Sequence, residues 1–364
     1  MSPRSGARNL LKNCARAQAG QSLLIAHEPA DLGYFDGKVV GHVAREARDL
    51  GLHVRLIDVG FDAENPQLSP ALLEQVEHAD IVLFLARLGD QLRFCHMPEG
   101  KTIVTSFAAT EELLGSGFGT GHYHAFEALK AATDRALGHA REVRLTCPRG
   151  TDVRGATQLD GADTRLKRFP LSVFAALPAA RFSGRVALPG FLTGTGSKYY
   201  TPYHLSLDGP LLALFSKGRL TGFAGAPHAV AQAEAHYDHV AGKFDLDRNT
   251  VHSWHAGIHP GCGFPWTLEE HTERWGGTAF GNPRLAHFHT CGAYAPGEIS
   301  WNVIDPTISL DGVPIWEDGV FQAHRLSGVA EIFSQYPDVA AMFASPDRAI
   351  GLSDRALYAE AAEV

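Results

Sequence analysis

Residues 22–60 read SLLIAHEPADLGYFDGKVVGHVAREARDLGLHVRLIDVG, and their pattern indicates the fold class of the N-terminal half. It opens with a short apolar run at 22–28, which is typical of a buried strand. Residues 39–51 place apolar side chains at helical spacing and end on Gly51, a common stop for a helix. A second strand pattern follows at 53–60. A strand, a helix and another strand in this order predict a parallel βαβ unit.

The same alternation of strand and helix patterns continues along the chain. Strand patterns recur at 80–86 and 101–107, and a long helix pattern covers 122–139. We therefore predict an α/β domain over 1–141 with a doubly wound parallel sheet. Its first strand is followed by His27-Glu28-Pro29 instead of a glycine-rich GxGxxG turn. A dinucleotide-binding domain is not expected for that reason.

The pattern changes in the second half, which we predict to be a separate α+β domain over 142–364. Strand patterns outnumber helical ones here, and glycine and proline interrupt them often. Lys217-Gly218 lies between two apolar runs, as in a β-hairpin. The one clear helix pattern covers 229–244, with His236 and His239 expected on its solvated face. We predict a largely antiparallel sheet with functional loops, because strands joined by tight turns pair in that way.

The composition is that of a globular protein, with 45% apolar and 20% charged residues. A net charge of −8 without clustered Lys and Arg argues against a nucleic-acid partner, because neutralising phosphates needs such clusters. The longest apolar runs are far shorter than the roughly 20 residues of a transmembrane helix, so no membrane partner is expected. The five scattered cysteines and the N-terminal stretch without an apolar segment lead us to expect a cytoplasmic protein.

Histidine is the unusual feature of this sequence, because six of the 19 histidines fall between positions 252 and 289. They are His252, His255, His259, His271, His287 and His289. His287 and His289 are two residues apart, so on a strand both side chains point to one face. Two or three imidazoles with one carboxylate, such as Glu298, can hold a divalent first-row metal and leave positions open. The spacing does not fix which of the six bind, since a buried histidine is often only a hydrogen-bonded structural residue.

Four motifs in the second half carry a resemblance to a known superfamily. They are RGTDVRG at 149–155, LFSKGRLTGFAG at 214–225, WHAGIHPG at 254–261 and ISLDG at 308–312. In this order they resemble the superfamily that contains the aminopeptidase T metallopeptidases and 2,5-dihydroxypyridine 5,6-dioxygenase. The resemblance implies a metal site in the second domain and is consistent with an α/β domain before it.

Within this superfamily, the resemblance separates two kinds of metal site at the first ligand position. The peptidase branch has a glutamate there and holds two metals, whereas the dioxygenase branch holds one Fe(II) with two histidines and an aspartate. His255 occupies this position here, so the chain is more similar to the dioxygenase branch. It departs from both branches later, because their His-x-Asp pair corresponds to Glu298-Ile299-Ser300. The resemblance therefore implies that His287 or His289 supplies the missing histidine, with Glu298 as the carboxylate.

Together these observations predict a mononuclear non-haem iron dioxygenase that uses O₂ to open the ring of a small hydroxylated aromatic or N-heteroaromatic compound. The expected Fe(II) ligands are His255, His289 and Glu298, with His259 or His287 carrying the substrate's hydroxyl proton. Two alternatives stay open. One is a metallohydrolase of the aminopeptidase or amidase type that uses zinc or another divalent metal. The other is a non-catalytic protein of the same fold that binds a small molecule. A homo-oligomer is expected from the resemblance alone.

Overall fold

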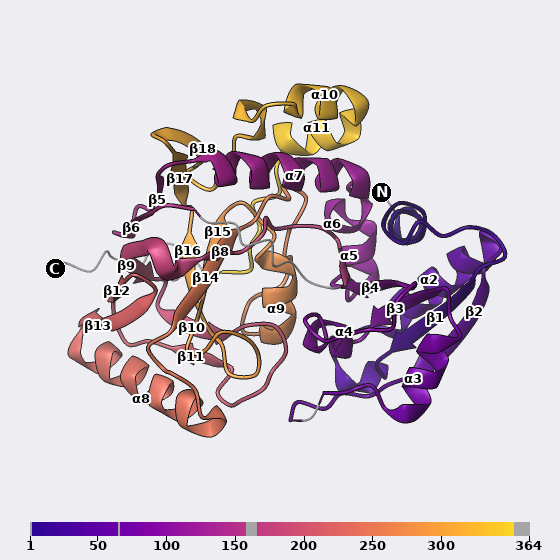
Figure 1. The fold of residues 1–364 in the computed structure, drawn as a ribbon, viewed down its shortest axis with the longest axis horizontal. Helices are drawn as coiled ribbons and strands as arrows, with labels where there is room; N and C mark the ends of the chain where they lie inside the picture. The colour runs from indigo at the N-terminus through magenta and orange to yellow at the C-terminus, as the bar shows by residue number, and fades with distance from the viewer. Residues whose placement is uncertain (1, 65, 158–165, 353–364) are drawn as a thin grey trace. The chain divides into compact units, whose positions relative to one another are not determined.

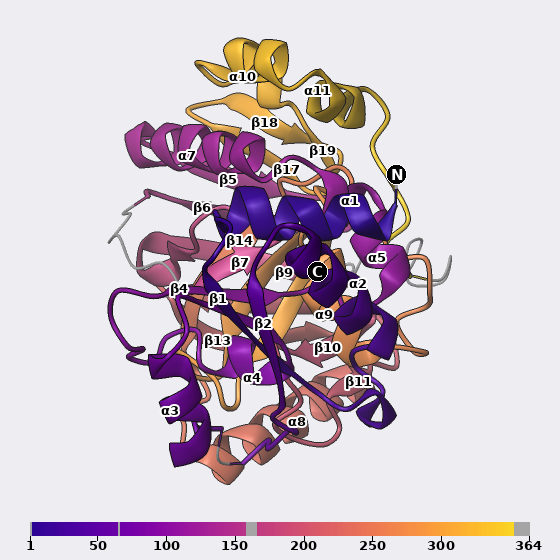
Figure 2. The same cartoon turned by 90° about the vertical axis from the view of Figure 1, so that its right-hand side faces the viewer.

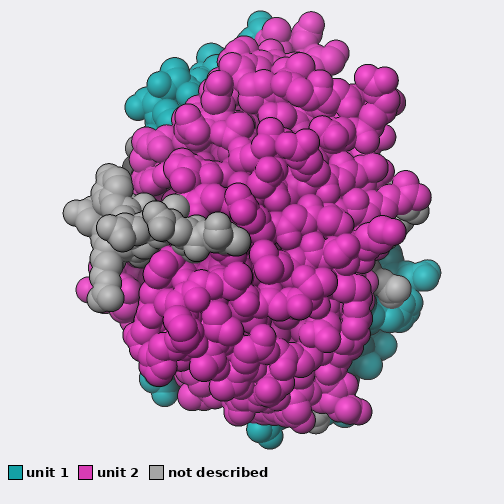
Figure 3. All heavy atoms as spheres, turned by 90° about the vertical axis from the view of Figure 1, so that its left-hand side faces the viewer, with its two compact units in different colours: residues 1–128, 163–172, 333–346 teal, residues 129–162, 173–332, 347–364 magenta. Residues whose placement is uncertain are grey.

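The computed structural model describes residues 2–64, 66–157 and 166–352. The chain forms two compact units, and neither is continuous in the sequence (Figure 3). Unit 1 comprises Met1–Ala128, Asp163–Ser172 and Phe333–Pro346, and unit 2 comprises Leu129–Ala162, Val173–Ile332 and Asp347–Val364. The chain first passes from unit 1 to unit 2 within helix α7 (Tyr123–His139).

Unit 1 is built on a five-stranded sheet with the order β2-β1-β3-β4-β7 (Figures 1 and 2). Its strands are β1 (Ser22–His27), β2 (His53–Asp58), β3 (Ile81–Leu85), β4 (Thr102–Ser106) and β7 (Lys167–Phe169). Every neighbouring pair is parallel. The predicted α/β part with a parallel sheet is therefore confirmed. Strand β7 adds to the predicted strands, because it comes from a segment much later in the chain.

Local sequence signals begin the helices that connect the first strands of unit 1. Helix α2 (Gly37–Asp49) begins where the Asp36 carboxylate accepts a hydrogen bond from the Val39 N–H at 2.7 Å. Helix α3 (Pro70–Glu77) begins where the Ser69 hydroxyl accepts a hydrogen bond from the backbone, with Pro70 at the first helical position. The other helical segments of the unit are α1 (Pro3–Arg8), η1 (Asn9–Cys14), η2 (Ala30–Leu32), α4 (Arg87–Gln91), α5 (Glu111–Gly115), α6 (Gly117–Thr120) and α11 (Pro337–Ala344).

A buried ion pair lies where sheets with this strand order usually bind ligands. Such sites lie at the carboxyl ends of the strands where the order reverses, which is between β1 and β3 in this sheet. Glu28 follows β1 and Arg87 follows β3, and Arg87 Nη2 lies 2.8 Å from Glu28 Oε2. The Arg87 guanidinium also lies 3.6 Å from the centre of the Phe61 ring. Because both charged side chains are buried, the protein's own charges occupy this end of the two strands.

Unit 2 contains two antiparallel sheets, one of eight strands and one of six. The eight-stranded sheet has the order β13-β12-β9-β6-β5-β17-β18-β19, and the six-stranded sheet has the order β11-β10-β16-β15-β14-β8. The first comprises β5 (Val143–Thr146), β6 (Asp152–Gly155), β9 (Phe182–Leu188), β12 (Leu211–Ser216), β13 (Arg219–Gly225), β17 (Thr307–Leu310), β18 (Val313–Glu317) and β19 (Val320–Phe321). The second comprises β8 (Leu177–Pro178), β10 (Phe191–Gly194), β11 (His204–Ser206), β14 (Val251–Ala256), β15 (Leu285–Thr290) and β16 (Ile299–Ile304). The predicted α+β, largely antiparallel C-terminal part is confirmed.

The predicted hairpin and the predicted helix of unit 2 are both present. Lys217-Gly218 joins β12 to β13, with φ of 49° and 72° that suit a tight hairpin turn. Helix α8 (Pro227–Phe244) lies next to β13 (Figure 1). The expectation that His236 lies on its solvated face is wrong, because His236 is buried. The other helical segments are η3 (Ala179–Arg181), α9 (Thr272–Ala279), η4 (Ala323–Arg325) and α10 (Val329–Gln335), which runs from unit 2 into unit 1.

None of the helices in the described ranges has the length and apolar character that crossing a membrane requires.

Aromatic side chains join the two sheets of unit 2. Trp254, Phe288 and Trp301 occupy paired positions on β14, β15 and β16, so they share one face of the six-stranded sheet. They pack against Phe182 of β9 and Phe215 of β12, with ring centres 5.5 to 5.8 Å apart. Side chains alternate along a strand, so the residues that come directly before and after each of these aromatic residues face the opposite side of the six-stranded sheet.

Candidate metal centre

Three histidines of the predicted site lie on that opposite face of the six-stranded sheet. His255 is next to Trp254 on β14, while His287 and His289 stand on either side of Phe288 on β15. His255 pairs with His287 in the register of the two strands, so their side chains are direct neighbours on one face. His289 shares this face, as the two-residue spacing predicts.

Ring nitrogens of these three histidines converge. The Nε2 atom of His255 lies 2.8 Å from Nε2 of His287 and 3.2 Å from Nε2 of His289. One nitrogen from each ring lies within 4.8 Å of the other two, which is close enough for all three to bind a single ion. In the part of the chain that the structure describes, no other three His, Cys, Asp or Glu side chains meet in this way. We call His255, His287 and His289 the histidine cluster.

Hydrogen bonds at Nδ1 of His255 and of His289 orient the Nε2 atoms of these two rings toward the centre of the cluster. His255 Nδ1 lies 3.1 Å from the Phe174 carbonyl, and His289 Nδ1 lies 3.0 Å from Oε1 of Glu298. Both partners only accept hydrogen bonds, so each Nδ1 carries the proton and donates it. When the rings are neutral, the Nε2 atoms of His255 and His289 then each carry a lone pair, and the 3.2 Å contact between these two atoms is repulsive. A cation between them removes the repulsion, so these residues fit a metal ion.

Glu298, predicted as a metal ligand, lies behind the cluster. It is buried and its carboxylate accepts the hydrogen bond from His289, while its backbone carbonyl accepts one from the Tyr200 hydroxyl at 2.9 Å. It is not part of the group of converging ligand atoms. A carboxylate in this position fixes the tautomer of a histidine ligand and makes its other nitrogen more basic.

His287, predicted as a proton carrier, belongs to the cluster itself. Its ring stacks on Phe280 with centroids 3.9 Å apart and an interplanar angle of 22°. The Phe174 ring meets His255 edge-on, with centroids 6.3 Å apart. These two phenylalanines give the buried cluster apolar walls, a feature that no local pattern in the sequence indicates.

His259, the other predicted proton carrier, lies in the turn after β14 and outside the cluster group. Its Nδ1 accepts a hydrogen bond from the Gly261 N–H at 3.2 Å, and its backbone N–H donates to Gly281. Complete burial lowers the pKa of His259 to about 3. The imidazole is therefore neutral at pH 7, and this pKa is far from the near-neutral value that suits proton transfer.

The remaining two histidines of the sequence cluster lie elsewhere on unit 2. His252 is also on β14, and its Nδ1 lies 3.1 Å from the hydroxyl oxygen of the neighbouring Ser253. His271 stands at the start of α9, and its ring packs edge-on against Trp266. Burial lowers the pKa of His271. Neither belongs to the group of converging ligand atoms.

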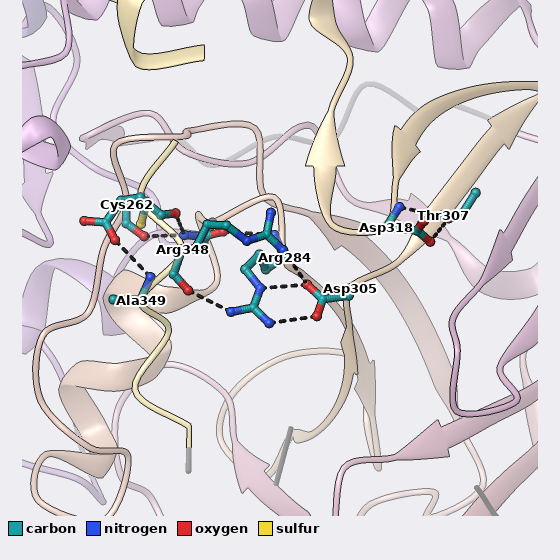
Figure 4. Close-up of polar contacts among 9 residues, drawn as sticks. Cys262, Arg284, Asp305, Thr307, Asp318, Arg348 and Ala349 are labelled. Atoms are coloured by element: carbon teal, nitrogen blue, oxygen red, sulfur yellow. Dashed lines mark hydrogen bonds and ion pairs between the residues drawn. The ribbon is translucent and has the colours of Figure 1, made fainter. Parts of the chain in front are cut away.

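An ion pair clamps the ends of the two strands next to the cluster (Figure 4). Arg284 precedes β15 and Asp305 follows β16, and two guanidinium nitrogens of Arg284 each lie 2.7 Å from a different carboxylate oxygen of Asp305. Arg284 also donates to the backbone carbonyl of Arg348 at 2.7 Å. Asn282 donates to the Cys262 carbonyl at 2.8 Å, which ties the turn after β14 to the residues before β15. These contacts hold β15, and with it His287 and His289, in place.

Polar residues that the sequence analysis missed continue the same face of the sheet. Ser300 and Asn302 on β16 pair with His289 and His287, and Thr193 on β10 pairs with Ser300. All three are buried, and the Asn302 side-chain amide donates to the Thr193 hydroxyl at 3.2 Å. The signal for β16 was present as the alternation Ser300-Trp301-Asn302, with the aromatic residue on one face and polar residues on the other.

The chain resembles known proteins in its fold. No protein-family model matches the sequence, and no curated protein matches it. Among solved structures, 2,5-dihydroxypyridine dioxygenase from Pseudomonas putida KT2440 matches with a TM-score of 0.58 and 15% identity, over 88% of this chain and 97% of that one. AmpT from Thermus thermophilus matches with a TM-score of 0.46 and 13% identity, over 88% of this chain and 98% of that one. The resemblance predicted from the sequence is therefore confirmed in the fold, which is that of the dioxygenase structure.

Proposed function

We propose that the chain is a metal-dependent enzyme with a mononuclear centre, and that it is an iron-dependent dioxygenase. Its substrate in this proposal is a small hydroxylated aromatic or N-heteroaromatic ring, which it opens with O₂. The observation that carries the proposal is the convergence of Nε2 atoms in the histidine cluster. Fold similarity to a 2,5-dihydroxypyridine dioxygenase supports the choice of reaction.

In this proposal His255, His287 and His289 hold the metal, and Glu298 keeps His289 in the tautomer that binds. This ligand set differs from the one expected from the sequence, which included Glu298 and left His287 to carry a proton. Iron held by these residues would leave positions open for a hydroxylated substrate and for O₂.

The surrounding residues orient the ligands and exclude water. The Phe174 carbonyl keeps the proton of His255 on Nδ1, and the Phe280 ring covers one face of His287. His289 is the cluster member that is not fully buried, with 12% of its side chain exposed. A substrate is expected to approach from its side.

The first test is metal content, measured by mass spectrometry on protein purified without oxygen. We expect about one iron per chain in the wild type and a large loss in His255→Ala. His252→Ala is the matched control, because it removes a histidine from the same strand but outside the cluster. The iron protein is then mixed with 2,5-dihydroxypyridine, and oxygen uptake is followed with the loss of ring absorbance. Absence of bound metal from the wild type would overturn the proposal.

One observation favours a second candidate, a zinc-dependent hydrolase. The converging group consists of three imidazoles without a carboxylate, and three histidines with a water molecule also hold catalytic zinc. Zinc as the bound metal, with hydrolysis of amides independent of oxygen, would favour this function. A bound metal without either activity would favour a non-catalytic small-molecule-binding protein.

A further inference from the structure

The face of the sheet that carries the histidine cluster continues into a buried row of uncharged polar side chains. Ser300 lies one strand away from His289, and Thr193 lies one strand beyond Ser300. Neighbouring strands are about 4.8 Å apart, so Ser300 and Asn302 border the cluster directly. The hydroxyl of Ser300 lies 3.4 Å from Oδ1 of Asn302.

Two more hydroxyls follow in the loop after β10. The Thr195 and Ser197 side chains are 7% and 2% exposed, and their hydroxyl oxygens have no hydrogen-bond partner among the described residues. Tyr200, in the same loop, donates a hydrogen bond to the backbone carbonyl of Glu298. The loop therefore lies beside the residue that supports His289. We call Thr193, Thr195, Ser197, Ser300 and Asn302 the polar strip.

Two unpartnered buried hydroxyls are unfavourable for folding. Each loses the hydrogen bonds that it makes with water in the unfolded chain without replacing them, and native proteins keep such groups rarely. A ligand that reaches the hydroxyls of Thr195 and Ser197 would satisfy them. This explains polar side chains at positions where an apolar residue would stabilise the free protein.

We propose that the polar strip binds the substrate through a polar ring substituent that does not reach the metal. This inference rests on the proposed function. All five members of the strip are uncharged, so they suit a neutral hydrogen-bonding group such as a hydroxyl or a carbonyl. A substrate that spans the cluster and the strip is then a ring with one hydroxyl for the metal and a second neutral polar group away from it.

Paired ligands test this assignment without catalysis. Zinc-loaded protein is titrated by calorimetry with 2,5-dihydroxypyridine and with 3-hydroxypyridine, which lacks the second hydroxyl. Thr195→Val and Ser197→Ala should each weaken binding of the first ligand by about three- to tenfold, the range expected for one hydrogen bond. Binding of 3-hydroxypyridine should change less than about twofold on the same scale.

Stability provides a second readout that separates ligand binding from a structural role. Because the two hydroxyls have no hydrogen-bond partner in the part of the chain that the structure describes, Thr195→Val and Ser197→Ala should leave the unfolding midpoint of the ligand-free protein unchanged or raised. Thr133→Val is the matched control, since the buried Thr133 hydroxyl donates to the Leu129 carbonyl at 2.8 Å. It should lower the midpoint and leave both affinities unchanged.

The outcomes distinguish this inference from the function on which it rests. Failure of the wild type to take up metal overturns the proposed function and the inference with it. Metal uptake with equal weakening of both ligands, no weakening of either, or no binding of either by the wild type overturns the polar strip alone.

Discussion

The Nε2 atoms of His255 and His289 are 3.2 Å apart, although each ring donates a hydrogen bond through its other nitrogen. Two neutral imidazoles in this arrangement present lone pairs to each other. A proton or a cation between the rings removes this repulsion, and His287 adds a third nitrogen to the same point. The hydrogen bonds at the two Nδ1 atoms therefore leave each Nε2 atom with a lone pair that can bind a cation.

Glu298→Gln should weaken metal binding by about 10- to 100-fold, the usual effect of replacing a hydrogen-bond partner behind a histidine ligand. The amide oxygen can still accept from His289 Nδ1, but the negative charge that makes the ring more basic is lost. Affinity is measured by competition with a chromogenic chelator. Glu317→Gln, at an exposed ion pair, is the control and should bind as the wild type does. Equal affinity in Glu298→Gln would mean that the carboxylate does not tune the site.

His287→Ala should abolish the thermal stabilisation that metal gives the wild type. A ligand at about 100 times its Kd stabilises the folded state by about 2.7 kcal/mol, and a variant without a ligand side chain loses most of this. The quantity compared is the shift in Tm on adding metal, so the altered packing against Phe280 cancels. His252→Ala should keep the full shift. An unchanged shift in His287→Ala would return His287 to the role of proton carrier predicted from the sequence.

His236 should make the protein less stable in mild acid. Burial lowers the pKa of His236 to about 4 in the folded chain, while an unfolded histidine has a pKa of about 6.5. The unfolded state therefore binds the proton first, so stability is full above about pH 6.5 and falls as the pH drops toward 4. Between pH 7 and pH 5 this amounts to about 2 kcal/mol.

Urea unfolding of the metal-free protein at the two pH values measures this effect. His236→Gln should lose less stability than the wild type between pH 7 and pH 5. His228→Gln, at a 73% exposed histidine of the same helix, should match the wild type. Equal pH dependence of wild type and His236→Gln would exclude His236 as the source.

Asp305→Asn should destabilise the fold by about 1.5–3 kcal/mol, the range for hydrogen bonds to a charged group. Asparagine tolerates the positive φ of 48° at this position, so the change removes the charge and leaves the backbone suited to its turn. The control is Asp247→Asn, which breaks an exposed ion pair with Arg219 and should cost less than about 1 kcal/mol. Denaturant unfolding measures the loss of unfolding free energy in both variants. Equal losses would show that the ion pair between Arg284 and Asp305 stabilises the fold no more than an exposed ion pair does.

Local patterns in the sequence predicted several elements of the fold. The apolar run at the start of residues 22–60 became β1, and the helical spacing after it became α2. The Lys217-Gly218 pair predicted a hairpin because it lies between two apolar runs and its glycine readily adopts the positive φ of a two-residue turn. Strand alternation also placed His287 and His289 on one face before any partner strand was known.

The composition of the site depended on contacts between distant segments, which no local pattern encodes. The pairing of β14 with β15 set His255 opposite His287, and the position of Glu298 behind His289 followed from the same sheet. His236 was misplaced for the same reason, since a helix pattern does not say what covers each side of the helix. Backbone propensity and side-chain alternation are local, so many helices and strands, and the histidines able to bind a metal, could be predicted from the residues. Which ring nitrogens converge depends on strand register, and register follows from the packing of whole sheets, so it is visible only in the folded protein.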